Sequence, residues 1–507
     1  MRRVVSLFLP TWPTDRWRRR QGKAAPSPET PVVLIGRQGR QRLVLAADPA
    51  AQALRIFPGL AAAQANAHAA DLVIDNADPQ GDLDALDRLA LWALKRYAPI
   101  VAADPPDGVV LDVTGATHRY GGEQGLLDDL VQHAADAGFA ARAAIADTWG
   151  GAHAASRFLA RPTLVIAPGE TPATLANLPT RALRLPPAMV EGLGKLGIDI
   201  IGEIVAKPRA PLALRFGPEL TRRLDQALGG AAEPIDPIEA PELITVREVF
   251  GEPIGAPETL ARYTTKLVGA LCAALEARGL GARLLDLRFH RVDNRIEAIR
   301  AGTARPVRDL KRLARLLCDR LEKVDPGFGV EAMTLAAPGA EPLDWRPVAN
   351  DLTGPPEPDV TDLVDTLTNR LGAGRLYRLS PAQSDVPERS ARKLAPADPP
   401  ASDTWPLQWP RPSRLLKRPE PIDAMALLPD QPPVAFTWRG VRRRIRRADG
   451  PERIFGEWWR RDGELEAVRD YFQVEDEAGE RFWIFRRGDG ERPITGDLSW
   501  WLHGVFA

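Results

Sequence analysis

The first 165 residues alternate between short apolar runs and segments whose apolar residues recur at helical spacing. The runs at residues 3–9 and 109–115 are rich in branched residues, and the second follows the turn dipeptide Asp107-Gly108. Such runs predict buried strands. Residues 83–97 and 126–137 have the spacing of amphipathic helices. There is no regular strand–helix–strand rhythm and no glycine-rich phosphate loop, so the pattern predicts an α+β domain on an antiparallel or mixed sheet.

Smaller elements complete this region. Residues 31–35 and 42–46 predict two short strands, and the alanine-rich residues 50–70 predict a helix. If strands 3–9 and 109–115 lie side by side, Phe8 and Asp107 face one cleft. The number of carboxylates in that cleft then decides whether it can hold catalytic metal ions.

Residues 175–230 have a wholly helical pattern. Within it, Leu196-Gly197-Ile198 followed by Gly202-Glu203-Ile204 predicts a helix end, a glycine turn and a new helix. Such a helix-hairpin-helix can offer the backbone N–H groups around Gly197, Ile198 and Gly202 to a DNA phosphate. An ordinary corner between two helices is an equally good interpretation of this segment.

Residues 240–340 predict a small α+β module, with strands at 284–290 and 330–335 and helices at 257–277 and 306–323. Arg288 and Arg291 are candidates for a face that binds the DNA backbone, and simple solvation of exposed arginines is the alternative. Residues 336–360 and 380–433 are rich in proline and poor in periodicity, which predicts linkers around a short helix at 361–371. The tail predicts a basic strand at 441–447, a hairpin around 477–480 and an aromatic core.

Composition narrows the functional classes. The 507 residues suggest three or four domains, and 67 basic residues balance 67 acidic ones, which argues against a uniformly basic nucleic-acid binder. Cys272 and Cys318 form neither a disulfide framework nor a zinc site, and no apolar stretch is long enough to span a bilayer. We therefore expect a cytoplasmic protein without cofactor, metal or membrane contact.

The order of these parts resembles the Y-family (DinB/UmuC-like) translesion DNA polymerases over residues 1–340, and within them the ImuB-like branch of bacterial mutagenesis cassettes. The resemblance rests on Arg2-Arg3-Val4-Val5, on Leu111-Asp112-Val113-Thr114-Gly115, on the glycine turn at 196–204, and on residues 305–329, 450–454 and 502–507. It implies an α+β multidomain fold with a palm and fingers over 1–165 (fingers at about 30–75), a helix-hairpin-helix thumb over 166–235, a little-finger-like domain over 240–340, a linker over 341–434 and a β-rich C-terminal interaction domain over 435–507.

The same resemblance implies that the catalytic site is degenerate. Active members carry an Asp on the first strand and an Asp-Glu pair before the second, and these carboxylates bridge two magnesium ions. The matching positions here are Phe8, Asp107 and Gly108. One carboxylate cannot hold two divalent cations, and Asp107 also fits an ordinary Pro-Pro-Asp-Gly turn.

The positions that match the family's triphosphate contacts are also changed. The family's Tyr and Arg fall near Pro49 and Gln52, and its Lys falls on Trp149. None of these side chains replaces a phenol, a guanidinium or an ammonium at phosphate oxygens. The resemblance therefore implies a scaffold rather than an enzyme.

Two alternatives stay open from the sequence. The chain is an active but divergent polymerase if Asp104, Asp112 or Glu123 supplies the missing metal ligands. Strand alternation places Asp112 on the opposite face from Asp107, which argues against it as a ligand. The third hypothesis is a protein-interaction platform without DNA contact.

As an ImuB-like chain, the protein is expected to link the beta sliding clamp, a RecA-like ImuA partner and an error-prone C-family DNA polymerase, with weak backbone contacts to nucleoid DNA. The clamp-binding candidate is residues 349–354, represented by Asp351, Leu352 and Gly354, and residues 404–409 are a second candidate. Either segment is alternatively a linker that binds nothing. In the tail, partner-binding candidates are Arg443, Arg444, Trp458 and Trp459.

Overall fold

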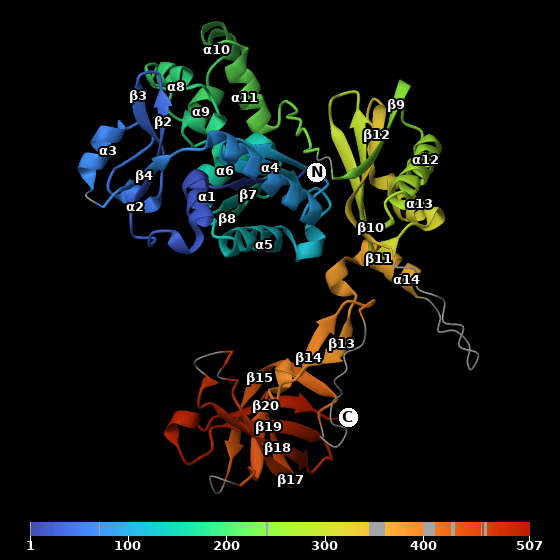
Figure 1. The fold of residues 1–507 in the computed structure, drawn as a ribbon. Helices are drawn as coiled ribbons and strands as arrows, with labels where there is room; N and C mark the ends of the chain where they lie inside the picture. Colours follow the sequence, from blue (N-terminus) through green and yellow to red (C-terminus); the bar gives the residue numbers. More distant parts are fainter. Residues whose placement is uncertain are drawn as a thin grey trace. The chain divides into compact units, whose positions relative to one another are not determined.

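The computed structural model describes residues 2–69, 71–239, 242–343, 360–398, 411–426, 431–457, 459–460 and 464–506. The chain divides into two compact units, Met1–Leu376 and Tyr377–Ala507 (Figure 1). None of the helices in these described ranges is long and apolar enough to cross a membrane.

The first unit is built on a five-stranded mixed sheet in the order β5-β6-β1-β7-β8. Its strands are β1 (Val4–Phe8), β5 (Ile100–Asp104), β6 (Gly108–Asp112), β7 (Arg142–Ala146) and β8 (Thr163–Val165). β1 is central and antiparallel to β6 and β7, whereas β7 and β8 are parallel. The predicted mixed sheet and both of its principal strands are confirmed.

Alternating side chains of β1 face different helices. Val5 and Leu7 pack with α4 (Pro79–Arg96) and α5 (Glu123–Asp136). The Ser6 side chain instead accepts a hydrogen bond from Ser156 of α6 (Trp149–Phe158). Phe8 shares the parity of Ser6, so it lies on the α6 face of the sheet.

A smaller sheet and a helical segment complete this part of the unit. The sheet has the order β3-β2-β4, with β2 (Val32–Gln38), β3 (Gln41–Ala47) and β4 (Val73–Asn76). Its helices are α1 (Trp12–Gln21), α2 (Pro49–Ala53) and α3 (Ala62–His68). The single helix predicted over 50–70 is wrong, because the chain turns at Pro58 and Gly59 between α2 and α3. The helical segment comprises α7 (Thr171–Leu175), α8 (Pro187–Gly194), α9 (Ile201–Val205), α10 (Arg209–Phe216) and α11 (Pro218–Leu228).

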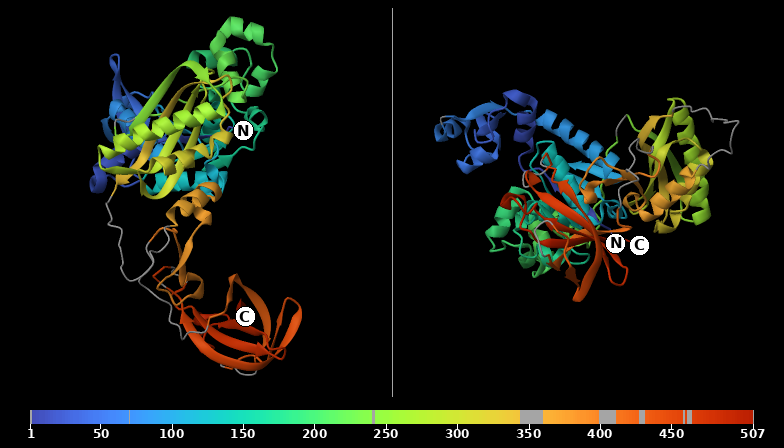
Figure 2. Two further views of the ribbon diagram at one scale, coloured as in Figure 1. Left: turned by 90° about the vertical axis from the view of Figure 1, so that its right-hand side faces the viewer. Right: turned by 90° about the horizontal axis from the view of Figure 1, so that it is seen from below.

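The rest of the first unit is a four-stranded antiparallel sheet in the order β11-β10-β12-β9. It contains β9 (Ile244–Ile254), β10 (Leu280–Arg291), β11 (Ile296–Val307) and β12 (Val330–Pro342). α12 (Pro257–Glu276) and α13 (Leu310–Cys318) pack on one face, as Figures 1 and 2 show. α14 has the predicted bounds Thr361–Leu371 and packs against β11.

The second unit contains a closed barrel and a short hairpin. The hairpin is β13 (Arg378–Pro381) with β14 (Ala391–Leu394), and the barrel strands are β15 (Arg414–Met425), β16 (Ala435–Trp438), β17 (Val441–Phe455), β18 (Val468–Asp476), β19 (Arg481–Arg487) and β20 (Trp500–Val505). The prediction that residues 380–433 lack regular structure is wrong for the described part, since three strands lie there. Short 3₁₀ turns connect elements of both units at Gly22–Ala24, Thr117–Tyr120, Thr180–Leu183, Leu321–Lys323, Ala373–Arg375, Pro387–Arg389 and Pro493–Thr495.

Candidate functional site

The candidate site lies where β1 ends and β6 begins. Phe8 and Gly108 are direct cross-strand partners, and the Leu9 N–H donates to the Asp107 carbonyl at 2.8 Å. The prediction that these chain segments meet at one edge is therefore confirmed. Phe8 contributes an aromatic ring to this edge, Gly108 contributes no side chain, and Asp107 contributes a carboxylate.

The guanidinium of Arg157 fills this edge. It reaches from the last turn of α6, and its Nη2 donates to Asp107 Oδ1 at 2.6 Å and lies 3.7 Å from Asp104 Oδ2. Its Cζ lies 4.7 Å from the centre of the Phe8 ring, a cation–π contact. The side chain is only 13% exposed. The positively charged guanidinium of Arg157 thus lies among the residues that match the family's metal-binding positions.

The residues present do not fit a two-magnesium centre. Phe8 offers no oxygen, and Asp107 already accepts a charge-assisted hydrogen bond from Arg157. A Cβ placed on Gly108 would lie 2.9 Å from the Leu7 carbonyl oxygen and 3.0 Å from Arg157 Nη2. A longer side chain at residue 108 therefore requires the arginine to move.

The surroundings of Arg157 are buried and polar. Burial raises the pKa of Asp104, while the charges of Arg157 and Arg184 oppose this rise. His153 Nε2 lies 3.8 Å from Asp104 Oδ2, and burial, together with the same two arginines, lowers the pKa of His153 to about 2. The imidazole is therefore neutral at physiological pH, and the carboxylates depend on arginine for their counter-charge.

The other candidate metal ligands lie elsewhere. Glu123 accepts hydrogen bonds from Arg3, and Asp112 accepts one from Arg2. Asp112 pairs with Val4, at the opposite end of β1 from Phe8. Only Asp104 joins Asp107 at the candidate site. Within the described ranges, no group of three or more His, Cys, Asp or Glu side chains is placed to share a metal ion.

The positions that match the triphosphate contacts also have protein partners. Gln52 donates through its side-chain amide to the Ala47 carbonyl. Trp149 is the first residue of α6, and the centre of its ring lies 5.0 Å from the guanidinium carbon of Arg184. Neither position presents a cation to a phosphate.

The predicted phosphate-binding turn uses its N–H groups internally. The N–H groups of Gly197, Ile198 and Gly202 donate to the carbonyls of Gly194, Leu193 and Ala176, respectively. The carboxylate of Glu203 accepts from the two residues that precede α9, so it stands at the helix start. The geometry of this turn gives no support to the DNA-binding prediction for these three residues.

The expectation that Arg288 and Arg291 are exposed is wrong. Each is 5% exposed. Arg288 donates to the Pro99 carbonyl, and Arg291 donates to the Asp293 carboxylate and the Asp325 carbonyl. Both arginines would have to leave these partners before they could contact a DNA backbone.

The predicted interaction residues of the linker and tail are distributed differently. Both clamp-binding candidates and one tail candidate lie outside the described residues: Asp351, Leu352 and Gly354, residues 404–409, and Trp458. Trp459 is 66% exposed. Arg443 packs over the Phe482 ring and pairs with the buried Asp476 and the exposed Glu480, whereas Arg444 is exposed on β17.

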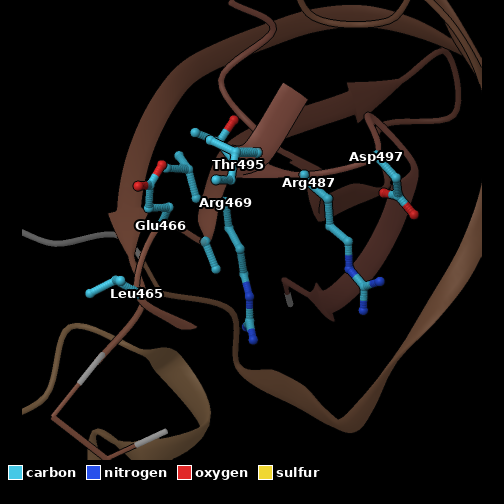
Figure 3. Close-up of a pocket in the computed structure, with 10 residues that line it drawn as sticks. Leu465, Glu466, Arg469, Arg487, Thr495 and Asp497 are labelled. Atoms are coloured by element: carbon cyan, nitrogen blue, oxygen red, sulfur yellow. The ribbon is translucent and has the colours of Figure 1, made fainter. Parts of the chain in front are cut away.

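A pocket that the sequence did not indicate lies on the second unit. Its cavity of about 590 Å³ is lined by residues 465–469, Arg487 and residues 494–497. Figure 3 shows the side chains of Arg469 and Arg487 extending beside each other. Leu465 and Ile494 are exposed by 65% and 68%. The pocket therefore combines apolar side chains with groups of both signs: Arg487, Arg469, which pairs with Glu388 at 2.9 Å, and the carboxylates of Glu466 and Asp497.

Comparison with known proteins places the chain in a family. Protein ImuB from two strains of Caulobacter vibrioides, NA1000/CB15N and ATCC 19089/CB 15, is 47% identical over 462 residues, which cover 89% of this chain and 99% of the relative. The chain belongs to the ImuB family. The resemblance recognised in the sequence is thereby confirmed.

Two domain models match parts of this ImuB-family chain. Residues 242–344 match the impB/mucB/samB family C-terminal domain, and residues 420–507 match a domain of unknown function, DUF6504. Solved neighbours include DinB from Sulfolobus solfataricus (14% identity, TM-score 0.37) and an insertion ternary complex of Dbh DNA polymerase (15%, TM-score 0.39). Each match covers 66% of this chain and 98% of the neighbour. The elements themselves give the α+β multidomain fold class that was predicted, with a β-rich C-terminal unit.

Proposed function

We propose that this ImuB-family chain is a non-catalytic, polymerase-like scaffold in DNA damage tolerance and induced mutagenesis. It links the beta sliding clamp, a RecA-like ImuA partner and an error-prone C-family polymerase at damaged DNA, which it contacts weakly through the backbone. One observation carries the non-catalytic part. Arg157 pairs with Asp107 beside Phe8 and Gly108, the positions that match the metal carboxylates.

The electrostatics of this arrangement explain why it opposes catalysis. Two divalent cations need several oxygen ligands and strongly repel a nearby fixed positive charge. Arg157 is such a charge, and it is held by a carboxylate and an aromatic face. Arg157 thus supplies the positive counter-charge of Asp107 that metal ions would otherwise supply.

The second unit supports the scaffold part of the proposal. Its pocket places Arg469 and Arg487 beside exposed Leu465 and Ile494. A segment of a partner protein would find apolar contact and ion-pair partners of both signs there, because Glu466 and Asp497 also line the pocket. We assign clamp binding to residues 349–354, as the family resemblance implies.

A bridging assay tests the scaffold function. Immobilised clamp is expected to retain the C-family polymerase and the ImuA-like protein only when the full-length chain is present, because the chain supplies separate binding sites. Leu352→Ala should weaken retention of the chain by the clamp, whereas Arg487→Glu should leave clamp binding intact and weaken retention of one of the other two proteins. Equal retention of both proteins without the chain would rule out the bridging role.

A further inference from the structure

Charge is separated along the barrel of the second unit. Residues 411–455, which contain β15, β16 and β17, hold 11 Lys and Arg against 5 Asp and Glu, whereas residues 456–507 hold 7 against 12. The whole chain is neutral, with 67 residues of each sign. One part of the barrel is therefore basic enough to attract an anionic partner, although the protein carries no net charge.

Strand alternation divides the arginine run of β17 between two faces. Ile445 belongs to the barrel core, and the Arg443 guanidinium lies 4.6 Å from the centre of the Phe482 ring. Arg442, Arg444 and Arg446 alternate with these two residues and are all exposed. Alternation therefore places Arg442 and Arg444 on the outer face of the strand. Arg446 lies at a register shift between Ile445 and Arg447 in the pairing of β17 with β18, and it joins the row because its side chain is exposed. Arg443, a partner-binding candidate from the sequence, is not part of this row.

The row has few counter-charges. Neither Arg442 nor Arg446 forms an ion pair with any residue that the structure describes. Arg444 has one 3.7 Å contact with Glu477, and the two side chains are 78% and 65% exposed. A contact so open to solvent contributes little and is easily exchanged for another anion.

Further exposed cations without an ion pair in the described ranges belong to the same basic part of the barrel: Arg414, Lys417 and Arg418 on β15, and Arg447 on β17. Their presence adds to the positive potential around the row. The basic surface is thus broader than the row itself.

We propose that the outer face of β17 binds the phosphate backbone of DNA, with Arg442, Arg444 and Arg446 contacting successive phosphates. Every second residue of a strand advances by about 7 Å, which is close to the spacing of neighbouring phosphates along an extended nucleic-acid strand. Guanidinium groups bind phosphate oxygens in a bidentate manner. Such contacts reach no base edge, so binding is independent of sequence.

The composition of the row favours DNA over an acidic protein. Protein interfaces draw most of their affinity from buried aromatic or apolar anchors. The three consecutive outward positions at 442, 444 and 446 are all arginine, with no such anchor between them. This inference rests on the proposed DNA contact and gives it a location, separate from the pocket of Arg469 and Arg487.

Salt-dependent binding of the full-length chain to labelled DNA tests the inference. The probes are a single strand of mixed sequence and the corresponding duplex, and the readout is fluorescence anisotropy. The variant Arg442→Gln/Arg444→Gln/Arg446→Gln is expected to bind roughly 10- to 100-fold more weakly near 0.1 M salt. The plot of log K against log salt should become less steep, by about 2 on the single strand and about 3 on the duplex. Each of the three phosphate contacts contributes about 0.7 to the steepness on a single strand and about 0.9 on a duplex.

Two control variants separate this effect from charge and folding. Arg460→Gln/Arg481→Gln/Arg492→Gln removes the same charge from the acidic part of the second unit, at residues outside the pocket, and should keep the wild-type slope. Arg443→Gln removes the inward arginine and should lower the thermal stability without changing the slope.

Three outcomes would overturn the inference: a wild-type slope in the row variant, an equal loss of slope in the charge-matched control, or no DNA binding by the wild-type chain. The bridging assay distinguishes this failure from failure of the proposed function. A row variant that no longer bridges clamp and polymerase, yet keeps its DNA salt slope, would assign the row to an acidic protein partner and also overturn the inference.

Discussion

Asp286→Ala is expected to destabilise the first unit by about 3–5 kcal/mol, the usual cost of removing one partner from a buried ion pair. Asp286 is fully buried and accepts two hydrogen bonds of 2.7 Å from Arg300, whose side chain is 7% exposed. Arg300 also donates to the carbonyls of Leu94 and Ala98, at and just beyond the end of α4. Without Asp286, its charge stays buried with only carbonyl partners.

Urea unfolding of the full-length chain, followed by fluorescence and hydrogen exchange in β10, measures this loss. Glu248→Ala is the control, because Glu248 pairs with a Lys266 side chain that is 61% exposed, and such a pair contributes less than about 1 kcal/mol. Asp286→Leu/Arg300→Met should recover most of the stability, since it leaves no unpaired charge. If Asp286→Ala unfolds at the same urea concentration as Glu248→Ala, the pair does not stabilise this region.

Arg157→Ala is expected to lower stability by about 2–3 kcal/mol at pH 7, somewhat less than a fully buried pair because Asp107 is 30% exposed. Arg157 is the strongest influence that opposes the burial-induced rise in the pKa of Asp104. Its removal raises that pKa further, while the unfolded carboxyl still titrates near about 4. The folded state then binds the proton more tightly, so the loss is largest above the folded pKa and shrinks as the pH falls towards 4.

Unfolding free energies of wild type and variant at several pH values test this dependence. Arg209→Ala is a matched control in the same unit, because Arg209 pairs with Asp225 while its own side chain is 61% exposed. That variant should lose less than about 1 kcal/mol, with little change over the same pH range. A loss for Arg157→Ala that is equally large at pH 4 and pH 7 would mean that Asp104 does not depend on this arginine.

The sequence predicted the central sheet because its signals are local. The runs of β1 and β6 are rich in branched residues, and a turn dipeptide precedes β6. The degenerate edge followed from the resemblance and from those two strands. The role of Arg157 was missed because the sequence of α6, which is rich in small residues, does not show which face of the helix packs against the sheet. Only the pairing of β1 with β6 and the packing of α6 place it beside Asp107.

β15 was missed for a different reason. It contains Pro419 and Pro421, which predict a linker because proline cannot donate to a sheet. The barrel accommodates this segment with a register shift between Leu415 and Glu420 in its pairing with β20. The direction of Arg443, by contrast, follows from strand alternation alone and could have been predicted once 441–447 was taken as a strand.

Burial also explains the errors at Arg288 and Arg291. A sequence shows that an arginine lies on a strand, but the carbonyls and carboxylates that receive it belong to distant segments, such as Pro99 for Arg288. Long-range partners of this kind decide whether a cation is presented to a ligand or used within the fold.

The central claim, that this chain is a scaffold and not a polymerase, is tested most directly by primer extension. The purified full-length chain is given a primed template, all four deoxynucleoside triphosphates and magnesium or manganese, with Asp107→Ala as the reference. We expect no extension by the wild type beyond that seen with the variant, because Arg157 already holds the only carboxylate at the three matching positions. Template-directed extension by the wild type that Asp107→Ala abolishes would contradict the account.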